Sequence, residues 1–162
     1  MEIKNLLQAI YDSSLATSIR QVAVLFPAIE TLHVIGITLV LGTIAVVDLR
    51  LIGYASHRRS AQRLIAELLP FTWAAFAMTV ISGLLLFASR SIDYAENKVF
   101  WAKMAVLVLA GTNMLIFHFG IHKRIEDWHE TLPPPMGARM AGFASLGLWV
   151  LVVFLGRWIA FV

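Results

Sequence analysis

The sequence contains no cysteine, and this absence excludes several kinds of site. Disulfides, thiolate catalysis, iron–sulfur clusters and thioether-linked haem all need a cysteine sulfur. Charged residues are also scarce, at 14% of the chain, whereas soluble domains carry roughly 25%. Hydrophobic residues make up 59%, and the mean hydropathy is +0.79. The composition therefore predicts an integral membrane protein that forms one domain over residues 1–162 and is surrounded by a lipid bilayer.

Four apolar segments are long enough to cross a bilayer as helices. Short connections between them favour an all-α membrane four-helix bundle with up-down-up-down topology. The apolar face of residues 1–20 predicts a short N-terminal interfacial helix. The amphipathic segment 56–70 predicts a surface helix that is capped by Ser60 and ends at Pro70. The expected spans are residues 24–53, 71–89, 99–122 and 139–160.

Small residues in the spans indicate where helices approach each other closely. We expect this role for Gly36, Gly42, Gly83, Gly111, Gly142 and Gly147.

Basic residues outnumber acidic ones, 13 to 10. They lie at the expected helix ends and in loops, where lipid headgroups and membrane orientation account for them. No nucleic-acid partner is therefore expected. The loops after the first and third spans carry more basic residues than the opposite face, so the positive-inside rule predicts that both termini lie outside the cytoplasm.

Ionisable side chains in the spans fall at two depths. His33 and Lys103 lie near the starts of the first and third spans, which run in the same direction. Asp48 and His118 lie fifteen residues further along these spans, which is about 22 Å in a helix. Ionisable groups at membrane depth are costly and are therefore functional candidates by default. The two histidines are too far apart to share one metal ion.

A histidine opposite a lysine in a helical bundle favours haem b with both residues as axial ligands. Imidazole is a common haem ligand, and bundles hold cofactors between facing helices. Ligation needs an uncharged lysine, and burial disfavours the ammonium form. Glu30, one turn before His33, would orient the imidazole or lie beside a propionate. Arginine is the natural propionate partner, and three further residues lie at this level: Arg90, Arg157 and Trp101.

Structural interpretations also fit these residues. Lys103 could extend its ammonium to the headgroups, and His33 could hydrogen-bond to Glu30 or to a neighbouring helix. At the inner level, a structural polar cluster is favoured over a second cofactor site. Its members are Asp48, Arg50, Asn113 and His118.

Two stretches resemble a known family. TLHVIGITLVLGTIAVVDLRL resembles the first span of the HemJ-type protoporphyrinogen oxidases, and WAKMAVLVLAG resembles their lysine-bearing helix. This resemblance implies haem ligation by His33 and Lys103. Residues 25–122 are also similar to an uncharacterised bacterial family of four-span membrane proteins. The matching segments are ETLHVIG, DLRLIG, PFTWAAF, SGLLLF, YAENKVFWAK and NMLIFH.

These observations predict a haem b protein of the bacterial cytoplasmic membrane, with periplasmic termini. It would transfer electrons between a quinone pool or small donor and a partner redox protein, and a homo-oligomer is a further candidate assembly. One alternative is a porphyrinogen oxidase of the HemJ type, which requires a large apolar cavity with a basic rim. Another is a cofactor-free accessory subunit of a membrane complex or transporter, in which Lys103 would point to the interface.

Overall fold

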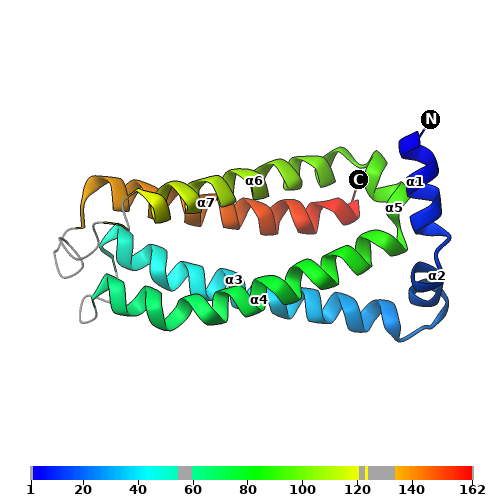
Figure 1. Cartoon of the computed structure of the whole chain (residues 1–162), viewed down its shortest axis with the longest axis horizontal. Coiled ribbons are helices and arrows are strands. Elements are labelled where there is room, and N and C mark those ends of the chain that lie inside the picture. Colours follow the sequence, from blue (N-terminus) through cyan, green and yellow to red (C-terminus); the bar gives the residue numbers. More distant parts are fainter. Residues whose placement is uncertain (1, 55–59, 121–122, 124–133, 162) are drawn as a thin grey trace.

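Four long helices form the protein (Figure 1). The computed structural model describes residues 2–54, 60–120, 123 and 134–161. Each of the four helices is long and apolar enough to cross a membrane, and their side chains are mostly exposed on the outside of the bundle. The predicted all-α four-helix membrane bundle is therefore confirmed. The helices are α3 (Leu25–Ile52), α4 (Ala61–Ser89), α6 (Lys98–Phe119) and α7 (Met136–Trp158), with α7 continued by a 3-10 turn, η2 (Ile159–Phe161).

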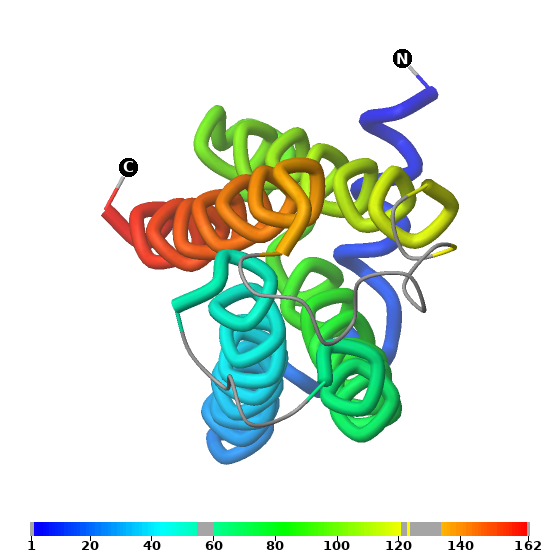
Figure 2. The backbone as a smooth tube through the Cα atoms, turned by 90° about the vertical axis from the view of Figure 1, so that its left-hand side faces the viewer, coloured from blue at the N-terminus to red at the C-terminus, as the bar shows by residue number. Residues whose placement is uncertain are grey.

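The helices are arranged as two pairs, α3 with α4 and α6 with α7, as Figure 2 shows along the bundle. The contact between α3 and α7 joins the pairs. Among the described residues, α4 and α6 pack together much less closely than these three pairs. The bundle is therefore held together chiefly through α3 and α7.

The N-terminal segment forms two helices instead of the one expected. They are α1 (Glu2–Tyr11) and α2 (Ser14–Gln21), and they lie across the end of the bundle beside α5 (Ser91–Glu96) (Figure 1). Ser13 breaks the segment because its side chain accepts a hydrogen bond from the Ala16 amide and caps α2. Ile19 is buried, and the Arg20 guanidinium donates to the Ser89 carbonyl at 3.1 Å. The segment thus also packs on protein, which its amphipathic pattern alone did not reveal.

The prediction that a surface helix ends at Pro70 is wrong. Ser60 does cap a helix, since its side chain accepts from the Arg63 amide, but α4 then continues through Pro70 to Ser89. Proline removes one backbone hydrogen bond, and membrane helices tolerate this where hydroxyl groups bond the backbone nearby. Here the Thr72 hydroxyl lies 3.0 Å from the Leu68 carbonyl and 2.9 Å from the Thr43 hydroxyl of α3.

Only half of the expected close helix approaches occur at the expected glycines. A Cβ at Gly36, Gly83 or Gly142 would meet a neighbouring helix at contact distance or closer. The prediction is wrong for three others, because among the described residues nothing lies within 4 Å of a Cβ built there: Gly42, Gly111 and Gly147. Those three lie on faces directed away from neighbouring helices.

Candidate functional site

The imidazole of His33 packs against Gly83 of α4. Its Cε1 is 3.0 Å from the position that a Cβ would take at Gly83, so only glycine leaves room for the ring there. His33 itself is half-buried, one-third of the way along α3. The pairing of α3 with α4, and not the contact with α7, therefore sets the position of this ring.

Two oxygen atoms of α4 hold the ring in orientation. Nδ1 of His33 lies 3.0 Å from the Thr79 carbonyl oxygen and 3.0 Å from the Ser82 hydroxyl. A carbonyl oxygen only accepts, so Nδ1 carries the proton. The Ser82 hydroxyl itself donates to the Met78 carbonyl at 2.7 Å. In the neutral ring, the lone pair is consequently on Nε2, which has no hydrogen-bond partner among the described residues.

Lys103 lies against the other helix pair. Its Nζ is 3.4 Å from the position of a Cβ at Gly156 of α7, and its stem follows the same glycine. Among the described residues, the amine has neither a hydrogen bond nor an ion pair. The side chain is half-buried and points into the α6–α7 contact. Gly156 was not among the glycines expected to serve a close approach.

His33 and Lys103 belong to different helix pairs and lie within electrostatic range of each other. The lysine charge is close enough to act on the imidazole, as is that of Glu30. Contacts with α7 give the depth of the lysine and of Asp48 along the bundle: Lys103 lies against Gly156, and the backbone of Asp48 lies against Gly142. These two glycines are fourteen residues apart, about 21 Å along a helix. The structure thus separates an outer level from an inner one.

The other residues expected at the outer level make contacts of their own. Glu30 is exposed, and the orienting bonds expected from it come from α4 instead. The guanidinium of Arg90 lies 5.3 Å from the Phe26 ring centre, and that of Arg157 lies 5.2 Å from the Phe161 ring centre. Trp101 is exposed and donates from Nε1 to the Ala95 carbonyl at 2.9 Å.

At the inner level, the expected cluster is only partly assembled. Asp48 and Arg50 are buried, and the Asp48 carboxyl interacts with the Ser145 hydroxyl of α7. Asn113 donates to the Ala141 carbonyl at 3.1 Å, next to the residue that touches Asp48. His118 lies more than one turn beyond Asn113 along α6. It is exposed, and its ring contacts that of Phe119 edge-on. Asp48 therefore shares its level with Asn113 and not with His118.

An aromatic cluster closes the outer end of the bundle, a feature that the sequence analysis missed. The rings of Phe87, Tyr94 and Phe100 lie with centroids 5.5 to 6.3 Å apart. Burial raises the pKa of the Tyr94 phenol, while the charge of Arg90 acts in the opposite direction. The cluster packs α5 against the last turn of α4 and the first turn of α6.

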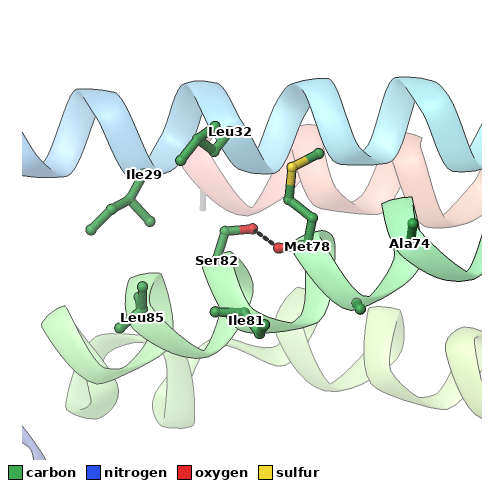
Figure 3. A pocket seen from close by; sticks show the side chains of 8 residues that line it. Ile29, Leu32, Ala74, Met78, Ile81, Ser82 and Leu85 are labelled. Carbon is green, nitrogen blue, oxygen red and sulfur yellow. Dashed lines mark hydrogen bonds between the residues drawn. The ribbon is translucent and has the colours of Figure 1, made fainter.

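An apolar groove of about 400 Å³ lies between α3 and α4 (Figure 3). Its single polar lining residue is Ser82, the hydroxyl partner of His33. No lysine or arginine lines it. Among the described residues, no group of three or more histidine, cysteine, aspartate or glutamate side chains could hold a metal ion. The groove is lined by Ile29, Leu32, Ala74, Ala77, Met78, Ile81, Ser82 and Leu85.

A family model described as a family of unknown function (DUF6644) matches residues 17–162. Comparison with curated proteins and with solved structures gave no significant match. The match does not connect the chain to the HemJ-type oxidases, so the ligand roles implied by that resemblance stay predictions. It covers all four spans, including α7, which the earlier resemblance left out. The chain therefore belongs to the family of unknown function DUF6644.

Proposed function

We propose that the protein binds haem b and transfers electrons in the bacterial cytoplasmic membrane. The observation that carries the proposal is the hydrogen bond from His33 Nδ1 to the Thr79 carbonyl. Histidines that ligate metals almost always donate their other ring N–H to a carbonyl, carboxylate or water. This bond fixes the tautomer and directs the lone pair to Nε2, the atom that haem iron would need.

The remaining residues also fit a haem. Lys103 supplies a second donor near His33, and its amine has no protein partner in the described part of the chain. Arg90 and Arg157 lie over aromatic rings, without a carboxylate partner among the described residues, and so are available to propionates. When bound, haem iron would supply reversible one-electron chemistry.

Electron transfer is favoured over catalysis by the character of the groove beside the histidine. A porphyrinogen carries several carboxylates and would need a basic rim, which this groove lacks. The oxidase interpretation therefore requires a different cavity. The accessory-subunit interpretation requires Lys103 to point to the interface, whereas the side chain crosses α7 at Gly156. A membrane quinone or a partner redox protein would exchange the electrons.

A matched pair of histidine variants tests this proposal. Both are purified from membranes with full haem supply, and haem per protein is measured by pyridine haemochrome. His33→Ala should lose haem, whereas His118→Ala, on the exposed face of α6, should retain it. Equal haem content in both variants would show that His33 is not a ligand.

A further inference from the structure

We propose that Asp48, beside Ser145, is a proton-binding site between α3 and α7. The site lies in the inner half of the bundle and does not depend on the haem proposal. Asp48 is 4% exposed, its carboxyl lies near the Ser145 hydroxyl, and its buried Oδ2 has no hydrogen-bond partner among the described residues. A buried carboxylate needs a cation or several donors, and an isolated one is very costly. A bound proton removes this cost.

Within the described part of the chain, no basic side chain forms an ion pair with the Asp48 carboxyl. On α3 itself, Arg50 is two residues away, which directs it to a different side of the helix. On α7, Arg139 is the arginine nearest in sequence to Gly142, which contacts the Asp48 backbone. Arg139 forms no ion pair with Asp48. The charged residues at this end of α4 pair with each other, Arg63 Nε with Glu67 Oε1 at 2.7 Å.

A proton fits the site better than a metal cation does. Hard cations such as Ca²⁺ take six to eight oxygen ligands. The described residues offer here one carboxyl and one hydroxyl. His118 and Asn113 do not extend this set, since His118 is exposed and the Asn113 amide donates to the Ala141 carbonyl.

Proton binding at this position is linked to helix packing. A Cβ at Gly142 would lie 3.0 Å from the backbone oxygen of Asp48 and 3.2 Å from Leu51 Cβ, so α3 and α7 are in backbone contact there. Hydration of an ionised Asp48 carboxylate would have to be accommodated beside this close contact. Loss of the proton should therefore separate α3 from α7, and its binding should favour the closed contact.

Infrared spectroscopy of the full-length protein in detergent tests the proposal directly. At neutral pH, the wild type should show the carbonyl band of a protonated carboxylic acid, and Asp48→Asn should lose it. Glu67→Gln, which removes an exposed and paired carboxylate, should keep the band. A band that persists in Asp48→Asn, or its absence from the wild type, would overturn the proposal. Loss of the wild-type band on adding sodium at constant pH would show a cation site instead.

A second measurement uses the wild type alone and does not depend on the folding of a variant. Dicyclohexylcarbodiimide partitions into membranes and adds to protonated carboxylic acids to give a stable N-acylurea. Peptide mass spectrometry should locate this adduct at Asp48, with labelling that decreases as pH rises. An unlabelled Asp48 beside labelled surface carboxyls would contradict the assignment.

Discussion

Replacement of Gly83 by alanine should displace the His33 ring while leaving the bundle folded. The added methyl group would lie 3.0 Å from Cε1 of the imidazole. The ring cannot move away freely, because Nδ1 is held by Thr79 and Ser82 at 3.0 Å each. Overpacking of this kind costs about 1–3 kcal/mol. Alanine regains about 0.5–1 kcal/mol over glycine within a helix. We therefore expect a net destabilisation of about 0–2.5 kcal/mol.

Gly111→Ala is the matched control, because among the described residues nothing lies within 4 Å of a Cβ at this position of α6. It keeps the helix-propensity gain and adds no clash, so it should stabilise the protein slightly. Thermal unfolding in detergent and haem content are measured for both variants. Gly83→Ala should lose most of its haem while it still unfolds cooperatively, at an unfolding temperature at or moderately below that of the wild type. Unchanged haem in Gly83→Ala would refute the argument that the contact with Gly83 positions the ligand.

Three further predictions concern the lysine, the aromatic end and the orientation. Lys103→Met should leave the bundle folded, since methionine is similar in length and apolar. It should shift the oxidised haem spectrum towards high spin, because the iron would lose one ligand. An unchanged spectrum would assign the lysine a purely structural role. Because burial raises the pKa of Tyr94 above 10.0, its stabilising contribution is complete below about pH 10 and is lost as pH rises towards the folded-state value. Tyr94→Phe should therefore reduce the alkaline loss of thermal stability, whereas Tyr54→Phe, at an exposed tyrosine, should not. A reporter inserted near Glu130 should report a cytoplasmic location, and periplasmic activity would reverse the orientation.

The two depths of the polar residues were predictable from the sequence because the rise of an α-helix is constant. Counting from His33 to Asp48 places them about 22 Å apart whatever the helices pack against. The contacts on α7 show the same two levels. The rotation of each helix about its own axis, which decides whether a side chain faces the bundle or the outside, does not follow from such a count. His118 was expected beside Asp48, but it faces outward, and Asn113 occupies that level instead.

The partners of His33 could not be predicted because they are a backbone carbonyl and a common hydroxyl. Glu30 was the obvious candidate by spacing along α3, but the ring turns towards Thr79 and Ser82 of α4. Membrane helices are apolar on all sides, so the usual polar stripe that identifies a buried face is missing. The same ambiguity explains Gly42, which was expected in a contact and lies in none that the structure describes.

The reduced-minus-oxidised absorption spectrum of the purified wild-type protein tests the central claim most directly. The protein is expressed with full haem supply and isolated in detergent, with its helical content verified by circular dichroism. Haem b held by His33 should give a sharp α band and a Soret band on reduction, at close to one haem per chain. A folded protein with a featureless visible spectrum would contradict the proposed function.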